Sequence, residues 1–284
     1  MSIERPALYV VATPIGNLGD FGPRAAAVLG AVDRIFCEDT RHSRRLLDHY
    51  GITTALEPLH AHNERRVAGQ LVARMRDAGE ACALISDAGT PLISDPGYVL
   101  VSSALDAGVA VRAVPGPSAL IAALSISGLP TDRFVFEGFL PSAAGARARR
   151  LAALADEPRT LVFYEAPHRL LAMLADLCEA FGAGRTAVVT RELSKRFETV
   201  YRGTLQALLG TLGEDPNATR GELVVLVAGA PPLAADAHEA EIDRLLGALL
   251  AETDQRTAVR VVTRLTGARR NAVYRRALAL AADD

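Results

Sequence analysis

A loop at residues 86–97 carries the side chains whose types and spacing best suit a binding site. Its sequence, SDAGTPLISDPG, holds two acids, two glycines and two prolines. Ala81–Ile85 before it has the length of a buried strand, and a helical period follows it. Ligands of open parallel sheets bind beyond the carboxyl ends of the strands, where glycine lets the backbone approach and a carboxylate accepts hydrogen bonds from a sugar or an amine. Asp87 and Gly89 are therefore candidate ligand contacts, although a connection stiffened by proline would look the same.

Other polar loops follow strand-like runs in the first half of the chain. Residues 13–20, TPIGNLGD, match neither G-x-G-x-x-G nor a lysine-bearing phosphate loop, which disfavours a dinucleotide or ATP cradle. Residues 115–119, PGPSA, place proline at a helix start, where free backbone N–H groups suit a polar or anionic ligand. Glu38 and Asp39 end a short apolar run. Two adjacent acids at the end of a strand are a candidate functional feature, while Asp39 or Thr40 could instead cap the next helix.

The order of the elements predicts an α/β fold with two domains. Strands and helices alternate up to residue 126, which predicts a parallel sheet with its loops at one edge. A strand at Glu198–Tyr201 indicates antiparallel pairing, so the second sheet should be mixed. We place an interdomain linker at Pro115–Pro130 and interpret Pro141–Arg150 as a basic, mobile segment. The predicted strands are Ala7–Ala12, Arg34–Cys37, Ala81–Ile85, Val109–Val114, Phe134–Leu140, Thr160–Tyr164, Ala187–Thr190, Glu198–Tyr201 and Glu222–Val227. The predicted helices are Pro23–Leu29, His42–Tyr50, Arg65–Ala78, one after Pro96, Leu120–Ile126, Leu170–Phe181 and Thr204–Leu212.

A basic helical extension is predicted after Pro231-Pro232. Helical patterns cover Glu239–Ala251, Thr257–Thr266 and Arg269–Ala281, with a break at Gly267. Seven arginines lie between Arg256 and Arg276, so this part is either a solvated surface or a helix-turn-helix that could hold phosphates. The expected domains are residues 1–116, 117–231 and 232–284.

Composition sets the cellular context. A chain of 284 residues, 50% hydrophobic, can bury roughly three quarters of its unfolded surface, which is the size at which cores divide. Three widely spaced cysteines indicate neither disulfides nor zinc, and His60 and His62 lack a third ligand at a recognisable spacing, so no metal site is expected. No apolar run reaches ~20 residues and no signal peptide is evident, so we expect a cytoplasmic protein without a membrane partner. The net charge of −2 directs attention to local arginine clusters.

Six motifs occur in order along the chain: Ala12–Leu18, Cys37–Arg41, Ser86–Gly97, Pro115–Ala119, Phe163–Arg169 and Arg191–Lys195. Together they resemble one family, the bacterial ribosomal RNA small subunit methyltransferases I, a branch of the tetrapyrrole methylase superfamily. The resemblance covers about Ala7 to Gly229. Where the superfamily usually has Gly-Asp-Pro, this chain has Ser86-Asp87-Ala88, a departure that matches the rRNA branch and argues against a porphyrin substrate.

The resemblance implies two α/β domains of the tetrapyrrole methylase type with S-adenosylmethionine in the cleft between them. It also implies a homodimer and 2′-O-methylation of a cytidine in the decoding region of 16S rRNA, with naked rRNA or the small ribosomal subunit as the partner. The reaction is a direct displacement by the ribose oxygen, for which positioning supplies much of the rate and no metal is required.

Candidate roles for individual residues come partly from these motifs and partly from the chemistry of the side chains. The residues that would contact the cofactor are Pro14, Asp87, Ala88, Gly89, Thr90, Ser118, Ala119, Tyr164 and Leu223. The groups that could take the hydroxyl proton are Glu38, Asp39, His168 and Glu192, each of which could instead be a cap or an ion-pair partner. The arginines that could hold the RNA backbone are Arg41, Arg44, Arg45, Arg147, Arg149, Arg150, Arg191 and Arg196.

Two other interpretations remain open at this point. A methyltransferase of the same fold could act on a tetrapyrrole or a protein side chain, which the missing Gly-Asp-Pro loop and the basic tail disfavour. Alternatively, the chain could be an RNA-binding module that does not catalyse. Calorimetry with S-adenosylmethionine separates this module from the rRNA methyltransferase, because a cleft that does not bind the cofactor cannot be a methyltransferase.

Overall fold

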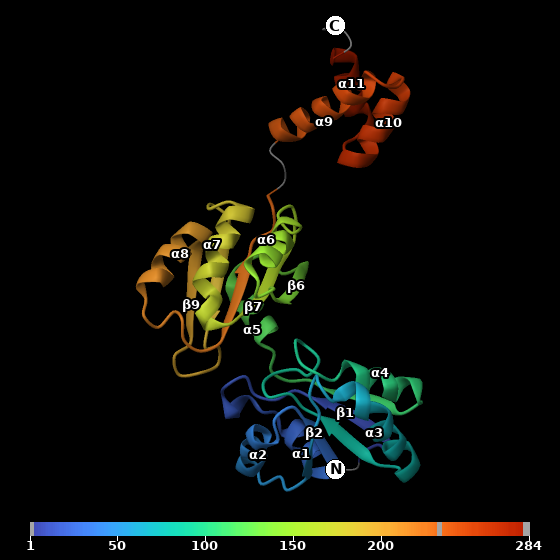
Figure 1. Cartoon of the computed structure of the whole chain (residues 1–284), viewed down its shortest axis with the longest axis vertical. Helices are drawn as coiled ribbons and strands as arrows, with labels where there is room; N and C mark the ends of the chain where they lie inside the picture. The colour runs from blue at the N-terminus through green and yellow to red at the C-terminus, as the bar shows by residue number, and fades with distance from the viewer. Residues whose placement is uncertain (1–2, 232–234, 281–284) are drawn as a thin grey trace. The chain divides into compact units, whose positions relative to one another are not determined.

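The structure is a computed structural model that describes residues 3–231 and 235–280. The chain divides into two compact units, Met1–Ala230 and Pro231–Asp284 (Figure 1). Within the described residues, the helices are all too short or too polar to cross a lipid bilayer. We keep residues 1–116, 117–231 and 232–284 as proposed domain limits.

The first sheet has five parallel strands in the order β3-β2-β4-β1-β5, which confirms the predicted parallel sheet. Alternate residues of β1 face opposite ways: Tyr9 packs with helices α1 and α2, and Leu8 packs with α3 and α4. Because helices cover both faces, the central strands β1 and β4 are apolar throughout. Because all five strands are parallel, their carboxyl ends lie at one edge of the sheet. The strands are β1 (Ala7–Val11), β2 (Arg34–Cys37), β3 (Ala55–Pro58), β4 (Ala81–Leu84) and β5 (Ala110–Val114). The helices are α1 (Pro23–Ala31), α2 (Thr40–His49), α3 (Glu64–Ala78) and α4 (Tyr98–Asp106), with a 3-10 turn η1 (Leu18–Asp20).

The second sheet has the order β6-β7-β10-β8-β9, and it is mixed, as predicted. β6 pairs with β7 in parallel, and the other pairs are antiparallel. Helix α5 (Ala119–Ser127) covers one face, and α6 (Ala144–Ala152), α7 (Leu170–Phe181) and α8 (Leu205–Glu214) cover the other. The strands are β6 (Phe134–Phe139), β7 (Thr160–Glu165), β8 (Thr186–Arg191), β9 (Thr199–Thr204) and β10 (Leu223–Val227), and η2 (Pro167–Arg169) follows β7.

Three segments differ from the sequence-based expectation. Pro141–Arg150 is not a mobile segment, because most of it belongs to α6, whose Leu151 is fully buried. The predicted linker at Pro115–Pro130 contains α5, which packs on the second sheet through Leu120 and Leu124. Strand β3 was not predicted, since this half-exposed edge strand has neither an apolar run nor a clear alternation.

The second unit is a small bundle of three helices, α9 (Ala235–Leu250), α10 (Gln255–Thr266) and α11 (Arg270–Leu280). Leu246, Val259, Val262 and Val273 form its core. Gly267, at a φ of +68°, ends α10, and its N–H donates to the carbonyl of Thr263. The three predicted helical patterns are confirmed, except that Ala281 lies outside the described residues.

Candidate functional site

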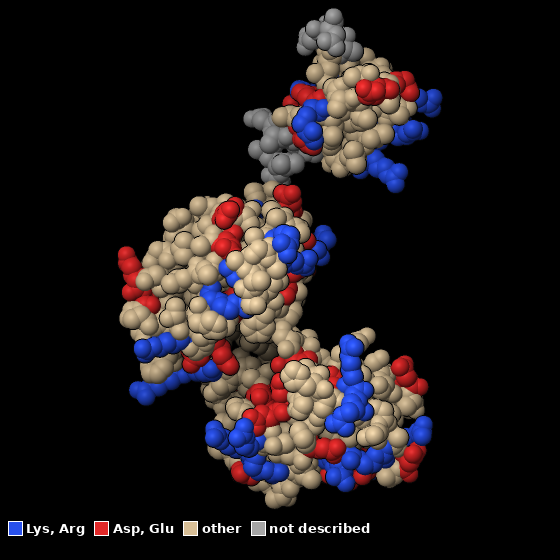
Figure 2. Space-filling model, in the orientation of Figure 1, with Lys and Arg blue, Asp and Glu red and all other residues tan. Residues whose placement is uncertain are grey.

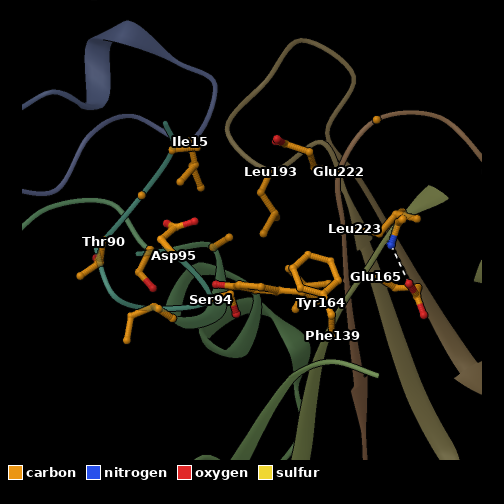
Figure 3. Close-up of a pocket in the computed structure, with 18 of the residues that line it drawn as sticks. Ile15, Thr90, Ser94, Asp95, Phe139, Tyr164, Glu165, Leu193, Glu222 and Leu223 are labelled. Atoms are coloured by element: carbon orange, nitrogen blue, oxygen red, sulfur yellow. Dashed lines mark hydrogen bonds between the residues drawn. The ribbon is translucent and has the colours of Figure 1, made fainter. Parts of the chain in front are cut away.

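A cavity of about 320 Å³ lies where the loops of the first sheet meet strands β7 and β10 (Figure 3). The loop after β4 provides Gly89, Thr90 and Asp95, while Tyr164 comes from the end of β7 and Leu223 from the start of β10. The volume is within the range of small-molecule sites, about 300–1,000 Å³. Because β1, β4 and β5 are parallel, their carboxyl ends carry these loops to the same edge of the sheet.

Gly89 holds the loop after β4 in a shape that few other residues can adopt. Its φ is +82°, and its backbone pairs with Thr13 through N···O distances of 2.8 and 3.1 Å. A Cβ atom at Gly89 would lie 3.3 Å from Ile15 Cγ2 and 3.7 Å from the carbonyl oxygen of Pro117. The Thr90 hydroxyl donates to that same carbonyl at 3.0 Å. The loop is therefore attached on both sides, to the loops after β1 and β5.

The charged residues that line this cavity are all acids. Among the described residues they are Asp95, Glu165 and Glu222, and no lysine, arginine or histidine joins them. The pKa of Asp95 is raised to about 6, mainly by burial and also by the negative charges of Glu38 and Asp87, although a hydrogen bond from Ser86 opposes this. A cavity of this kind favours a ligand with positive charge.

Tyr164 and Phe139 form the aromatic side of the cavity, with ring centroids 5.7 Å apart. The Tyr164 hydroxyl accepts a hydrogen bond from the backbone N–H of Leu120 at 3.2 Å. Burial raises the pKa of Tyr164, and the nearby charge of Asp95 adds to this against the Leu120 N–H. The first turn of α5 is thus tied to the end of β7, and a flat apolar surface is left for a ring system.

Glu165 is the last residue of β7 and lines the cavity next to Tyr164. Its Oε1 accepts from the N–H of Ala166 at 2.8 Å, the bond drawn in Figure 3, and lies 3.2 Å from Arg169 Nε. Its Oε2 has no hydrogen-bond partner within the described part of the chain. Burial raises the pKa of Glu165, although the Ala166 N–H and Arg169 oppose it.

The nine predicted cofactor contacts lie in the walls of two adjoining cavities. Asp87 and Pro14 line only the second cavity, of about 390 Å³, where Asp87 Oδ1 accepts from the backbone N–H of Asp39 at 3.3 Å. Ala88 lines both cavities. The first cavity brings together Ala88, Gly89, Thr90, Ser118, Ala119, Tyr164 and Leu223.

Sequence reasoning missed several lining residues, chiefly Asp95, Phe139, Glu165 and Glu222. Asp95 stood within the recognised loop, and an acid near its end was a signal that could have singled it out. Glu165 and Glu222 stand at the ends of predicted strands. Phe139 had no signal of its own, because alternate residues of an apolar strand look alike before their faces are known.

The four candidate proton acceptors lie in different settings. Asp39 caps α2 by accepting from the N–H groups of Arg41 and His42, which lowers its pKa. Burial would raise the pKa of Glu192, but hydrogen bonds from Lys195 Nζ and the Glu222 N–H lower it overall. Asp39 is therefore engaged as a helix cap, and Glu192 is engaged in an ion pair with Lys195.

The other two candidates, Glu38 and His168, form no ion pair and no side-chain hydrogen bond within the described residues. Glu38 follows β2, and its charge acts on Asp95 in the cavity. His168 lies in η2, next to the lining residue Pro167. Glu192 is the candidate in direct contact with a cavity acid, because its Oε1 accepts from the Glu222 N–H, whereas Glu38 acts on Asp95 through its charge. None of the four candidates is itself among the residues lining the first cavity.

The eight predicted RNA-contacting arginines fall into exposed and engaged groups. Figure 2 shows Lys and Arg side chains over α2, which carries three of them. The engaged side chains are Arg44, donating to the Ile52 and Thr54 carbonyls, Arg150, paired with Glu137, Arg191, donating to Thr199, and Arg147, paired with Asp176. The exposed side chains without such partners in the described structure are Arg45, Arg149 and Arg196, and Arg41 is exposed beside Asp39.

Arg147 corrects the expectation of an RNA contact at this position. The residue is only 7% exposed, and its Nε lies 2.5 Å from an Asp176 carboxylate oxygen, so it joins α6 to α7. Arg147→Ala should lower the free energy of unfolding by about 3 kcal/mol, because it leaves a partly buried carboxylate unpaired. Urea unfolding measures this, and Arg149→Ala on the exposed side of α6 should change stability by less than about 0.5 kcal/mol. Equal stability of the two variants would contradict the structural role.

Comparison with known proteins gives a consistent result. Residues 7–209 match the family described as Tetrapyrrole (Corrin/Porphyrin) Methylases, and residues 236–281 match the RsmI C-terminal HTH domain. The ribosomal RNA small subunit methyltransferase I of Pseudomonas aeruginosa is 54% identical over 272 residues, covering 95% of this chain and 96% of that protein. Its counterpart in Escherichia coli O157:H7 is 46% identical over 271 residues, covering 95% and 94%.

Solved structures show the same fold at low sequence identity. The methyltransferase CobJ aligns with a TM-score of 0.59 at 20% identity, over 79% of this chain and 94% of that one. A uroporphyrin-III C-methyl transferase from Thermus thermophilus, complexed with S-adenyl homocysteine, aligns with a TM-score of 0.54 at 19% identity, over 78% and 96%. The resemblance seen in the sequence motifs is confirmed: the chain belongs to the ribosomal RNA small subunit methyltransferase I family of the tetrapyrrole methylases.

Proposed function

We propose that this chain transfers a methyl group from S-adenosylmethionine to the ribose 2′-oxygen of a cytidine in the decoding region of 16S rRNA. The observation that carries the proposal is the acidic, partly aromatic cavity of about 320 Å³, whose charged lining residues within the described chain are three carboxylates. Its relatives named as ribosomal RNA small subunit methyltransferases and the solved neighbour complexed with S-adenyl homocysteine support the same activity.

The lining residues fit this cofactor. Tyr164 and Phe139 offer a flat apolar surface for the adenine, and Gly89 allows the ligand to approach the backbone closely. Asp95 places negative charge in the cavity, which would favour a positively charged sulfonium. When bound, the cofactor supplies a methyl group that is already activated by the positive charge on its sulfur.

The protein's own part in the chemistry is to position, shield and take a proton. Holding the two reacting atoms roughly 3–3.5 Å apart removes much of the entropic barrier to transfer. The hydroxyl proton needs an acceptor, for which Glu38, Asp39, His168 and Glu192 remain our candidates. Glu38 is favoured among them, because its charge acts on Asp95 and no ion pair engages it in the described structure.

The substrate partner in this proposal is 16S rRNA or the small ribosomal subunit, within the cytoplasm. Exposed arginines, including Arg45 and Arg196, are available for phosphate contacts, which would make the affinity fall as salt rises. The second unit adds Arg256, Arg260 and Arg264, spaced four residues apart on the exposed side of α10. A homodimer is also part of the proposal, and Tyr98 and Leu105 on α4, 73% and 59% exposed, offer apolar surface to a second copy.

Transfer of labelled methyl groups tests the function directly. Purified full-length protein is incubated with labelled S-adenosylmethionine and either naked 16S rRNA or small subunits from cells lacking the modification, and the product nucleotide is mapped. We expect a 2′-O-methylcytidine. Methylation of a base, a protein or a tetrapyrrole would replace this assignment with the corresponding one, and RNA binding without cofactor binding would indicate a non-catalytic module.

A further inference from the structure

The second cavity adjoins the first one through a common wall. It has a volume of about 390 Å³ and lies between the loop after β1, helix α2 and the loop after β4. Ile15, Ala88 and Glu222 line both cavities. A group in one cavity is therefore separated from a group in the other only by this shared wall.

The two cavities differ in charge. The first has only acids among its charged lining residues. The second has the acids Asp87 and Glu222 but also His42, Arg45 and Lys195, within the part of the chain that the structure describes. An anionic phosphodiester would therefore be repelled from the first cavity, whereas in the second it would meet positive charge beside the basic residues. Its volume is within the range of sites that hold molecules the size of a nucleotide.

Lys195 is already committed to contacts within the protein. Its Nζ lies 2.8 Å from Glu192 Oε1 and 2.7 Å from Glu222 Oε2, so its charge is matched. Its side chain also lies over Gly16, where an added Cβ would be 2.4 Å from Lys195 Cε. Lys195 therefore builds the wall of the second cavity rather than supplying free positive charge.

Arg45 is the available cation in this cavity. It is exposed and its side chain forms no ion pair or hydrogen bond with any residue in the described part of the chain. Its neighbour Arg44, in contrast, donates to two backbone carbonyls. His42 and Leu46 lie three residues before and one residue after Arg45, so α2 turns one face toward the cavity. The Asp39 cap sets where this helix begins.

We propose that the second cavity is the acceptor subsite, which takes the target nucleotide of the RNA with Arg45 on its phosphate. This inference rests on the function proposed above. The nucleotide leaves its neighbours' stack to enter, as a target base does in enzymes that modify bases. Its ribose then faces the wall at Ala88 that the two cavities share, with Arg45 and His42 holding the phosphate at the far side.

The phosphate contact can be isolated with a double-mutant cycle between protein and RNA. The RNA is a target-site fragment that the wild-type chain binds, made with either a normal phosphate or a neutral methylphosphonate at the target nucleotide. The protein is the full chain, as wild type, Arg45→Ala or Arg66→Ala. Arg66 is a matched control, because it is exposed on α3 at the opposite face of the sheet and unpaired within the described residues.

We expect Arg45→Ala to weaken RNA binding about tenfold or more, the usual effect of losing a charged hydrogen bond. Affinity for S-adenosylhomocysteine should stay within about twofold. The methylphosphonate should weaken binding to the wild type and to Arg66→Ala by a similar factor, and it should have almost no further effect on Arg45→Ala. A methylphosphonate placed several nucleotides away should weaken RNA binding by the same factor in all three proteins.

The possible failures can be told apart. If the two changes add independently, Arg45 does not contact the target phosphate and the acceptor subsite is wrong, while the proposed function stands. If the wild type neither binds nor methylates any RNA, the proposed function itself fails. An unchanged thermal midpoint for Arg45→Ala shows that the variant is folded.

Discussion

Gly89→Val is expected to abolish binding of S-adenosylmethionine and S-adenosylhomocysteine in a chain that remains folded. At a φ of +82° a β-branched side chain is strained by about 1–3 kcal/mol, and its Cβ would press on Ile15 at 3.3 Å. Relief requires the loop to move away from Thr13, and this movement dismantles the wall of the cavity. Titration calorimetry should show at least a hundredfold loss of affinity for both ligands.

Gly184→Val is the matched control for this substitution. Gly184 lies in the turn before β8, its backbone does not have the left-handed φ of Gly89, and a Cβ there meets nothing within 4 Å. The variant should bind both ligands as the wild type does. Circular dichroism checks that both variants are folded. Wild-type affinity in a folded Gly89→Val chain would show that the ligand does not depend on this loop.

Asp95→Asn should weaken the binding of S-adenosylmethionine more than the binding of S-adenosylhomocysteine. The two ligands share every group except the methyl and the positive charge on sulfur, so their difference reports on the charge. A negative Asp95 attracts a sulfonium in the cavity and does not attract the neutral thioether. We expect the ratio of the two affinities to fall about tenfold in the variant, as measured by calorimetry at pH 7.5.

The same group gives the wild type a defined pH dependence. The pKa of Asp95 is raised to about 6 by burial and by the charges of Glu38 and Asp87, with Tyr164 also facing it. Bound positive charge favours the ionised carboxyl. Affinity for S-adenosylmethionine should therefore increase as pH rises through about 6, with a smaller change for S-adenosylhomocysteine. An affinity ratio that is flat between pH 5 and 7.5 would exclude this role for Asp95.

The free energy of unfolding of the ligand-free protein should change in the opposite direction, falling as pH rises. A carboxyl with a raised pKa favours the folded state when protonated, and this contribution is lost as pH rises through about 6. Asp95→Asn removes the loss, so the variant should be more stable than the wild type at pH 8, by about 1–2 kcal/mol after allowing for solvent screening. At about pH 4 the two proteins should be nearly equal. The cavity thus stores unfavourable charge that a cationic ligand relieves.

The strand ends and their loops were largely predictable from the sequence. Short apolar runs such as Ala81–Leu84 are buried on both faces of a parallel sheet, so they appear as uninterrupted hydrophobic segments followed by polar loops. The loop motifs also placed Gly89 and Thr90 at the cavity, because strand direction alone puts these loops at one edge. The prediction of an RNA contact at Arg147 was wrong, because the sequence does not distinguish an arginine paired inside the fold from one exposed to solvent.

The sequence by itself determined the alternation of strands and helices, the family and the loops that meet at the site, since these depend on local patterns along the chain. Tertiary structure alone decided that Asp95 and Tyr164 share the first cavity, and that Asp87 and Arg45 line the second one. It also decided which arginines are free. The physical reason is that charge, burial and cavity walls depend on distances between residues far apart in sequence, such as Ala88 and Glu222, and no local pattern encodes those distances.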